Sequence, residues 1–254
     1  MPATRHGYHR PFITAHTGCE GTPRNSLASI VAGIAAGADA VEVDVRATSD
    51  GYPVLVHDET VTGDDGVTRP VEQLTLDELH AVTRDGNDAA GGRSEPVIAL
   101  ADALSLARER NIDINIDLKD DLCIPGVIAE IERLDVSELV VLSGCTRERA
   151  ATITGRHPEV RVLLNTDEPG AGGHEGDYDS FVAAVCRDAI YAGCCGINID
   201  FRVCRDELVL FARRRFLPVS VWTVNSAEEM VQMMELGVFA ITTDNPGQLS
   251  AMFS

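Results

Sequence analysis

The chain has 254 residues, of which 44% are hydrophobic and 24% charged, a composition typical of globular proteins that can fill a core. Its formal net charge of −19 at pH 7 argues against nucleic acids and anionic membrane surfaces as partners, because both would repel the chain. A small anionic substrate is still compatible with this charge, since such a molecule responds to local rather than net charge.

Neither a membrane span nor a disulfide framework is expected. The sequence has no run of about eighteen apolar residues, and its N-terminal stretch lacks the apolar core of a signal peptide. The seven cysteines are scattered, odd in number and without C-x-x-C spacing, which is typical of reduced thiols in a cytoplasm. We therefore expect a cytoplasmic protein with no stable membrane insertion.

The chain begins with a short predicted strand and a helix. Residues 12–15 are apolar and end at His16, which favours a strand. Residues 25–36 predict a helix that starts near Asn25 and ends at Gly37.

Residues 41–58 combine a second strand with a predicted hairpin. Three valines alternate with Glu42 and Asp44, and in a strand this alternation places both carboxylates on one face. The Asp-Gly pair at 50–51 lies between two alternating runs and predicts a two-residue turn, which would bring His57 level with Asp44. Paired carboxylates on a buried strand repel each other unless a cation lies between them, so this stretch predicts a divalent-metal site.

Two helices and a loop are predicted next. Thr75 and Glu78 have the spacing of a capping box and predict a short helix to about Arg84. The stretch 85–96 is rich in glycine and polar residues, which is typical of a surface loop, and 97–110 predict a helix rich in alanine and leucine.

The clearest strand covers residues 112–119. Its isoleucines and leucine face one side, whereas Asp113, Asn115, Asp117 and Lys119 face the other. A solvated strand face could explain this stripe, but a neighbouring strand with the same pattern favours one shared site. Asp117 would then be a third oxygen ligand, and three carboxylates suit Mg²⁺ or Ca²⁺ better than zinc. Lys119 is either a solvated lysine or a contact to a phosphate group.

The rest of the chain alternates between helices and strands. The predicted helices cover 125–134, 146–155, 179–192, 204–215 and a segment from Ser226, with a short one after Pro246, and the predicted strands cover 139–143, 160–164, 195–199, 217–224 and 238–243. Without the return strand of the hairpin, this gives eight strands, each followed by a helix. The pattern predicts one α/β domain over 1–254, a (β/α)8 TIM barrel with a hairpin and loop insertion after its second strand, at approximately 46–96.

Polar residues at the predicted strand ends converge on one site. In such barrels the chemistry lies at the carboxyl ends of the strands. These positions hold His16, Asp44, Asp117, Lys119, Asn225 and Asp244. Taken singly, His16 and His57 would more often be structural, but as a pair beside a metal-bound ester they suit general acid–base cleavage. Trp222 is either core packing or an apolar wall of the pocket.

Seven segments, in this order and spacing, carry a resemblance to a known family. They are AHTG (15–18), RNS (24–26), VEVDV (41–45), SDGYPVLVHD (49–58), INIDLK (114–119), VSVWTVN (219–225) and ITTDNPG (241–247). Through them the chain resembles the glycerophosphodiester phosphodiesterases over nearly its whole length. The resemblance implies a (β/α)8 barrel that hydrolyses a small phosphodiester, a glycerophosphodiester, to glycerol 3-phosphate and an alcohol with the help of Mg²⁺ or Ca²⁺.

The resemblance also implies roles for individual residues. Glu42 and Asp44 correspond to the metal-binding pair of the family, and Asp117 stands where the family has a glutamate as the third carboxylate. Lys119 corresponds to a lysine near the phosphate. His16 and His57 correspond to the two catalytic histidines, which would exchange acid and base roles while the 2-hydroxyl of the substrate forms a cyclic phosphate that water then opens.

The chain departs from the family pattern in one loop. The family motif His-Arg-Gly is His-Thr-Gly here, with Thr17 in place of the arginine, and Glu-Asn-Thr is replaced by Arg24-Asn25-Ser26. One interpretation is that Arg24 returns the lost positive charge and binds the phosphate. The other is a changed substrate or a loss of activity.

Three hypotheses for the function therefore stand beside each other. The leading one is metal-dependent hydrolysis of glycerophosphodiesters by two histidines. A second is a related, even cyclising, cleavage of a phosphodiester with another head group. A third is a catalytically silent barrel that only binds phosphorylated metabolites. The sequence leaves open the alcohol part of the substrate, the native metal and the oligomeric state. We expect the loop at 60–96, which follows the hairpin over the site, to decide the alcohol part.

Overall fold

Eight parallel strands close into a barrel at the centre of the molecule. The computed structural model describes residues 9–63, 65–83, 96–166 and 177–253. In the order around the barrel the strands are β1 (Phe12–Ala15), β11 (Ala240–Thr243), β10 (Val219–Trp222), β9 (Gly196–Asp200), β8 (Arg161–Thr166), β7 (Val140–Cys145), β6 (Asp113–Leu118) and β2 (Ala40–Ala47). Parallel pairing of β1 with β2 closes the ring, which confirms the predicted (β/α)8 barrel.

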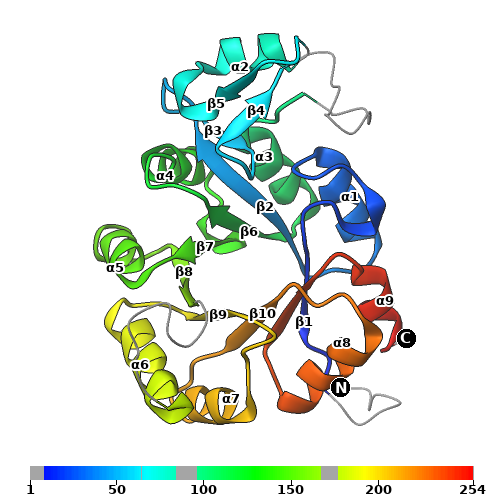
Figure 1. The fold of residues 1–254 in the computed structure, drawn as a ribbon, viewed down its shortest axis with the longest axis vertical. Coiled ribbons are helices and arrows are strands. Elements are labelled where there is room, and N and C mark those ends of the chain that lie inside the picture. The colour runs from blue at the N-terminus through cyan, green and yellow to red at the C-terminus, as the bar shows by residue number, and fades with distance from the viewer. Residues whose placement is uncertain (1–8, 64, 84–95, 167–176, 254) are drawn as a thin grey trace.

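Helices surround this barrel (Figure 1). They are α1 (Leu27–Ala35), α3 (Leu100–Arg110), α4 (Ile124–Leu134), α5 (Arg147–Arg156), α6 (Tyr178–Tyr191), α7 (Asp206–Arg213), α8 (Ala227–Leu236) and α9 (Pro246–Ala251). In the part of the chain that the structure describes, no helix has both the length and the hydropathy that are needed to cross a bilayer.

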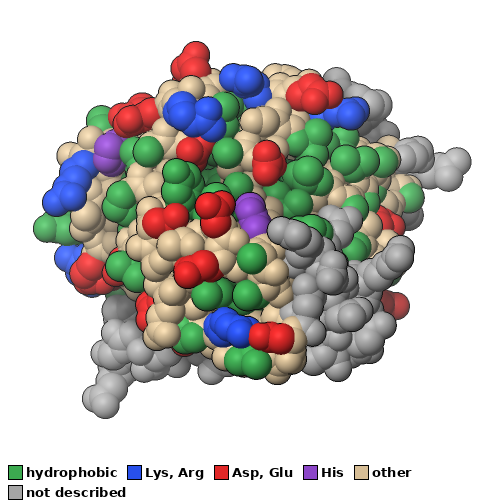
Figure 2. Space-filling model, turned by 90° about the horizontal axis from the view of Figure 1, so that it is seen from above, with side chains coloured by type: hydrophobic (Ala, Val, Ile, Leu, Met, Phe, Trp, Pro, Cys, Tyr) green, Lys and Arg blue, Asp and Glu red, His purple; other side chains and the backbone are tan. Residues whose placement is uncertain are grey.

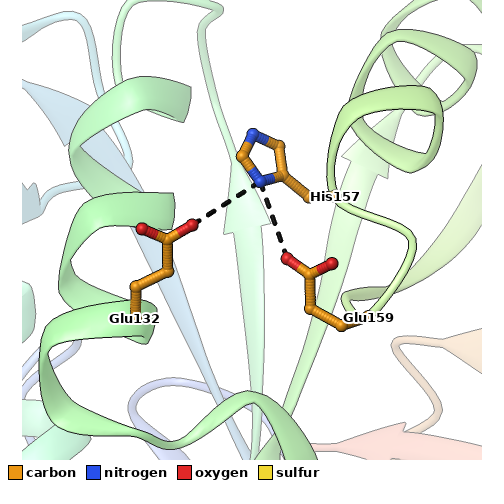
Figure 3. Close-up of side chains that lie close together, drawn as sticks. All are labelled: Glu132, His157 and Glu159. Carbon is orange, nitrogen blue, oxygen red and sulfur yellow. Dashed lines mark ion pairs between the residues drawn. The ribbon is translucent and has the colours of Figure 1, made fainter.

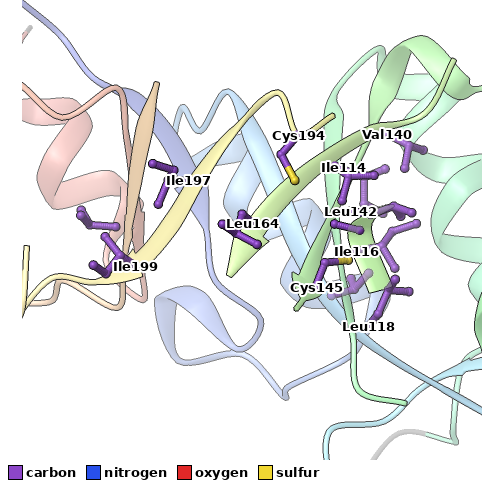
Figure 4. Packing of buried hydrophobic residues seen from close by; sticks show 14 of the residues in the cluster. Ile114, Ile116, Leu118, Val140, Leu142, Cys145, Leu164, Cys194, Ile197 and Ile199 are labelled. Carbon is purple, nitrogen blue, oxygen red and sulfur yellow. The ribbon is translucent and has the colours of Figure 1, made fainter. Parts of the chain in front are cut away.

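The hydrophobic core lies between the barrel and the helices. Most large apolar side chains of the strands point outward, as Ile114, Ile116 and Leu118 of β6 do, and these three residues are at most 2% exposed. Figure 4 shows them packed beside Leu142 and Cys145 of β7. The alternate positions of the same strands point into the barrel and carry the polar residues of the site.

The hairpin after β2 differs from the prediction in its turn. Strand β3 (Pro53–Leu55) pairs antiparallel with β2, and Ala47 faces Pro53. The connection therefore has five residues, 48–52, instead of two, because the Thr48 N–H bonds the carbonyl of Tyr52 at 3.0 Å and closes a wider loop. The return strand still brings the chain level with Asp44, whose carbonyl accepts the N–H of Val56 at 3.1 Å.

The rest of the insertion forms a small cap beside the barrel. It contains β4 (Thr60–Thr62), β5 (Thr68–Pro70) and α2 (Leu76–Val82), which lie at the upper end of the view in Figure 1. Figure 2 shows this end of the molecule, where acidic and basic side chains are interspersed with apolar ones. The predicted loop 85–96 lies, apart from residue 96, outside the described residues.

Helix starts follow the capping signals in the sequence. Thr75 and Ser226 both form complete capping boxes, at α2 and α8. Helix α1 starts near Asn25, as predicted: its N-cap is the next residue, Ser26, whose side chain accepts the N–H of Ser29. Asn25 has a φ of 52°, outside the helical region, and its side chain takes part in the site below.

Candidate active site

A cavity of about 460 Å³ opens at the carboxyl ends of the barrel strands. It is lined by all eight residues that the sequence predicted for the site, namely His16, Arg24, Glu42, Asp44, His57, Asp117, Lys119 and Trp222. A larger cavity of about 840 Å³ lies at the amino ends of β1 and β10, but only Asp39 contributes a carboxylate to it, and this group is paired with Arg10. The chemistry of the lining, not the size, therefore identifies the first cavity as the candidate site.

Three carboxylates converge on its floor from two adjacent strands. The register of β2 against β6 places Asp44 directly beside Asp117, and Glu42 lies one inward position below Asp44. Each of the three residues offers an oxygen within 4.8 Å of the other two. Glu42 is only 6% exposed and Asp44 only 2%. Inward-facing positions on neighbouring parallel strands thus create a compact set of oxygen ligands.

Burial and mutual repulsion disfavour the charged state of this group of carboxylates. Burial, together with the charges of Asp44 and Asp117, raises the pKa of Glu42 well above its usual range. Burial also acts to raise the pKa of Asp44, but the ammonium of Lys119 and a hydrogen bond from Asn25 lower it overall.

Lys119 compensates for only part of this negative charge. Its Nζ lies 2.8 Å from Asp44 Oδ1 and 2.6 Å from Asp117 Oδ2. Although burial acts to lower the pKa of Lys119, the two carboxylates raise it, so the side chain is an ammonium. One ammonium faces three carboxylates, and a divalent cation held by oxygen atoms alone fits this set.

His16 is held by a carboxylate at the end of β11. Its Nδ1 lies 2.6 Å from Asp244 Oδ1, while its Nε2 is 3.9 Å from Glu42 Oε2. The amide of Asn225 donates to the other oxygen of Asp244 at 2.6 Å. With Nδ1–H donating to Asp244, Nε2 remains as the nitrogen available in the cavity.

His57 lies in the hairpin segment, two residues after the end of β3. Its Nδ1 lies 2.8 Å from Asp58 Oδ1, and its backbone carbonyl accepts the Arg46 Nε–H at 2.9 Å. Each histidine is thus paired with a carboxylate at Nδ1, although only His16 is mostly shielded from solvent.

Thr17 and Asn25, in the segment between β1 and α1, hold the carboxylates of the site in place, a role that the sequence did not predict for them. The Asn25 amide donates to Asp44 Oδ2 and accepts the Asp44 N–H, both at 3.0 Å. Thr17 is buried, its N–H donates to Glu42 Oε2 at 3.0 Å, and its hydroxyl accepts the Asn25 N–H at 2.5 Å. An asparagine immediately before a helix N-cap was the available signal, because asparagine tolerates a positive φ.

The two arginines that line the cavity differ in their freedom. Arg149 donates to Asp121 at 2.6 Å and to the carbonyls of Leu118 and Gly144. Arg24 is exposed, and in the described parts of the chain it forms no ion pair. Arg24 is therefore the guanidinium that remains available to an anion in the cavity.

Trp222 and the insertion define the borders of the cavity. Trp222 lines the cavity wall, and its buried Nε1–H has no hydrogen-bond partner among the described residues. No described residue of 59–83 lines the cavity. The prediction that the segment 60–96 decides the substrate thus gains no support from its described part, while 84–95 lie outside it.

A second group of metal-ligating side chains lies on the outside of the barrel (Figure 3). The His157 Nδ1 is 3.7 Å from Glu132 Oε1 and 3.6 Å from Glu159 Oε1. These side chains come from α4 and from the connection between α5 and β8.

Comparisons with known proteins agree with the fold. The profile of the Glycerophosphoryl diester phosphodiesterase family matches residues 9–248. A glycerophosphodiester phosphodiesterase from Caldanaerobacter subterraneus is 26% identical, over 94% of this chain and 96% of its own length.

Solved structures share the barrel. A structure from Silicibacter pomeroyi that bears the family name superposes with a TM-score of 0.82 at 24% identity, and covers 97% of this chain and 94% of its own. A phosphodiesterase from Oleispira antarctica, described in complex with the product sn-glycerol-3-phosphate, gives a TM-score of 0.78 at 20% identity, with 95% and 96% of the two chains covered.

Proposed function

This chain belongs to the glycerophosphoryl diester phosphodiesterase family of hydrolases, and from that premise we propose that it cleaves glycerophosphodiesters to glycerol 3-phosphate and an alcohol. The observation that carries the proposal is the convergence of two carboxylate-paired histidines and three carboxylates in one cavity. A silent barrel would not need to keep both acid–base groups and the full ligand set together.

Glu42, Asp44 and Asp117 are proposed to hold Mg²⁺ or Ca²⁺. The excess of negative charge over Lys119 supports this assignment, as does a ligand set made only of oxygen atoms. A cation bound there would polarise a phosphoryl oxygen and offset negative charge that develops on the phosphate. Asn25 and Thr17 keep the carboxylates in place by their hydrogen bonds to Asp44 and Glu42.

His16 and His57 are proposed to move the protons. In the first step one imidazole takes the proton of the substrate hydroxyl that attacks phosphorus, and the other protonates the departing alcohol. In the second step the roles reverse, as a water molecule opens the cyclic phosphate. Asp244 and Asp58 would keep the Nδ1 proton on each ring, so that each Nε2 is the nitrogen that exchanges protons.

The cations and the tryptophan are proposed to bind the substrate. Lys119 would contact the phosphate beside the carboxylates, and Arg24 would bind it from the opposite loop as the exposed guanidinium without an ion pair. Trp222 would form the wall against the organic part of the substrate, with its Nε1–H free to donate to it.

Two broader expectations are proposals as well. We propose that residues 1–254 act as one domain with an insertion after β2, which is supported by the single closed sheet that contains all barrel strands. We also propose a cytoplasmic location, which is supported by seven free cysteines, six of them buried.

Turnover with a panel of substrates tests the proposed function. The purified protein, supplied with Mg²⁺ or Ca²⁺, should release glycerol 3-phosphate from at least one of several glycerophosphodiesters, as measured by a coupled dehydrogenase assay. Release of a cyclic phosphate as the final product would instead favour the cyclising alternative. Absence of any product from the whole panel, with either metal, would rule out the proposal.

A further inference from the structure

One strand of the barrel is irregular at the wall of the candidate active site. Strand β7 pairs with β8 in regular register at its first residues, but the register then shifts, and Cys145 faces Leu164. Ser143 and Gly144 therefore lie opposite a single residue of β8, Leu163, which makes this point a β-bulge. Bulges are frequent beside active sites, where they redirect a side chain. Both bulge residues line the active-site cavity.

Side chains from two neighbouring elements hold the bulge in place. Gly144 has a φ of 70°, and its N–H donates to Asn165 Oδ1 at 2.8 Å. Its carbonyl accepts a hydrogen bond from Arg149 Nη1, which also donates to the carbonyl of Leu118 at 2.8 Å. Leu118 directly follows Asp117 at the end of β6. The bulge is thus a fixed part of the cavity wall, and it is tied to the strand that carries the third carboxylate.

The bulge contacts this carboxylate directly. The hydroxyl of Ser143, a residue that is 1% exposed, donates to Asp117 Oδ1 at 3.3 Å. The same oxygen occupies the space beside Gly144 in which any other residue would carry its Cβ. A Cβ at position 144 would overlap Asp117 Oδ1 and would lie 2.6 Å from the carbonyl oxygen of Leu118, closer than real Cβ atoms approach their neighbours. Asp117 can therefore take this position only beside a glycine.

Backbone conformation alone does not explain the contact. A positive φ favours glycine at a position whether or not the space beside it is filled. Gly51 and Gly237 also have a positive φ, of 82° and 77°, but a Cβ at either would meet nothing within 4 Å. At Gly144 the space is filled by a carboxylate of the site. Asp117 depends on such contacts, because its side chain is 22% exposed whereas that of Asp44 is only 3% exposed.

We propose that the bulge of Ser143 and Gly144 is a positioning element of the metal site and that it holds Asp117 in the ligand set. This inference rests on the proposed role of Asp117 as a ligand for Mg²⁺ or Ca²⁺. Asp117 Oδ2 accepts a hydrogen bond from Lys119 at 2.6 Å, so the ammonium fixes one oxygen and the bulge fixes the other. A side chain at position 144 would turn Asp117 away and leave two carboxylates for the cation.

Titration calorimetry of the metal-free full chain with Mg²⁺ and with Ca²⁺ tests the proposal without any substrate. Gly144→Ala should weaken the binding of both ions about 10- to 100-fold, which is the range for the loss of a group that orients a metal ligand. Gly237→Ala is the matched control, because it strains the backbone at a similar φ but fills open space, and it should bind like the wild type. Equal affinity of Gly144→Ala and the wild type would overturn the proposal.

A crystal structure of Gly144→Ala gives a second measurement. It should show Asp117 turned away from the bulge, while Asp44 keeps its position on β2. An unmoved Asp117 in this variant would contradict the proposal, because any loss of metal affinity would then have another cause.

Ser143→Ala keeps the proposal testable even where Gly144→Ala does not fold. It removes the hydroxyl that donates to Asp117 and leaves the backbone of the bulge unchanged, so it should weaken metal binding about threefold to tenfold. Wild-type affinity in folded Ser143→Ala, as judged by circular dichroism, would show that the bulge does not hold the carboxylate.

The outcomes separate this proposal from the proposed function. If the wild type binds neither ion, the metal assignment itself fails, and the role of the bulge fails with it. If the wild type binds metal and turns over substrate, but the two bulge variants bind metal equally well, only the role of the bulge is wrong.

Discussion

Among the described residues, two groups of side chains have the spacing of metal ligands, and they differ in almost every other respect. Glu42, Asp44 and Asp117 lie inside the barrel mouth, whereas the group of Glu132, His157 and Glu159 lies on the outer surface. Glu42 is 6% exposed, but the Glu132 and Glu159 side chains are 62% and 51% exposed. Ligand spacing alone therefore does not define a metal centre in this protein.

The two groups differ in the free energy that is needed to keep their side chains charged. Water surrounds the outer group and screens it, so its charges need no further compensation. The inner group is buried, and its carboxylates repel each other, which raises the pKa of Glu42 well above its usual range. A buried set of like charges is stable only with a counter-charge, and Lys119 supplies one positive charge for three negative ones. The inner group can thus lower its free energy by taking up a cation or a proton, whereas the outer group has little to gain from either.

Removal of divalent metal should have the largest effect and should depend only on the inner group. Dialysis against EDTA should lower kcat/KM by more than about a thousandfold, because the counter-charge for the phosphate is lost. Mg²⁺ or Ca²⁺ should restore turnover of the wild type and of Glu132→Gln, but not of Asp44→Asn. Equal metal dependence of Glu132→Gln and Asp44→Asn would contradict the assignment of the metal to the inner group.

Replacing a histidine of the cavity should lower kcat far more than replacing the histidine of the outer group, and this is the next largest expected difference. His16→Ala should lower kcat by about 10²- to 10⁴-fold, which is the range for the loss of a general acid or base. His157→Ala, the matched change in the outer group, should leave kcat within about twofold of the wild type. Full activity of His16→Ala in steady-state assays would overturn the proposed mechanism.

Arg24→Ala should affect binding more than turnover. Because Arg24 is the exposed guanidinium of the cavity without an ion pair, its loss should raise KM about tenfold and change kcat less. Arg156→Ala, near the outer group, serves as the control and should leave both constants unchanged. An unchanged KM in Arg24→Ala would show that the guanidinium does not bind the phosphate.

The smallest expected effect is on the stability of the metal-free protein. A raised pKa means that the folded state prefers protonated Glu42, so this group favours folding at low pH. That contribution is lost as the pH rises above about 4.5, the ordinary value, through the raised one. Glu42→Gln should therefore raise the Tm of the metal-free protein at pH 7 by about 2–5 °C. It should also flatten the pH dependence of Tm, and a lower Tm in thermal unfolding would contradict this account.

The barrel and the lining of its mouth could be predicted because both follow from strand alternation. The polar stripes at Glu42, Asp44 and Asp117 depend only on the two-residue period of a strand and on the shared edge of parallel strands. The same logic placed His16 and Lys119 at the mouth. Arg24, His57 and Trp222 also line the cavity, but strand alternation alone did not place them there.

Features that depend on local geometry or on distant pairing could not be predicted in this way. The five-residue loop of the hairpin is fixed by the hydrogen bond between Thr48 and Tyr52, which an Asp-Gly pair does not reveal. The contact of His16 with Asp244 joins residues 228 positions apart, through the pairing of β1 with β11. The cavity of about 240 Å³ inside the barrel, toward the amino ends of the strands, takes its lining from all eight strands, so only the closed barrel shows it.

The two proposed catalytic histidines follow strands that differ in their pairing, and this difference sets which part of the active site would unfold first on heating. His16 follows β1, which pairs on both sides within the closed ring. His57 follows β3, the last strand in the sheet order, which pairs with β2 on one side and is joined on the other side by a single bridge, between Val54 and Ala99, and by the Leu55 N–H to the Ile98 carbonyl. Edge segments with few partners open at lower free energy than a closed core. Heat inactivation would therefore begin with reversible fraying of the hairpin, while the barrel itself is still folded.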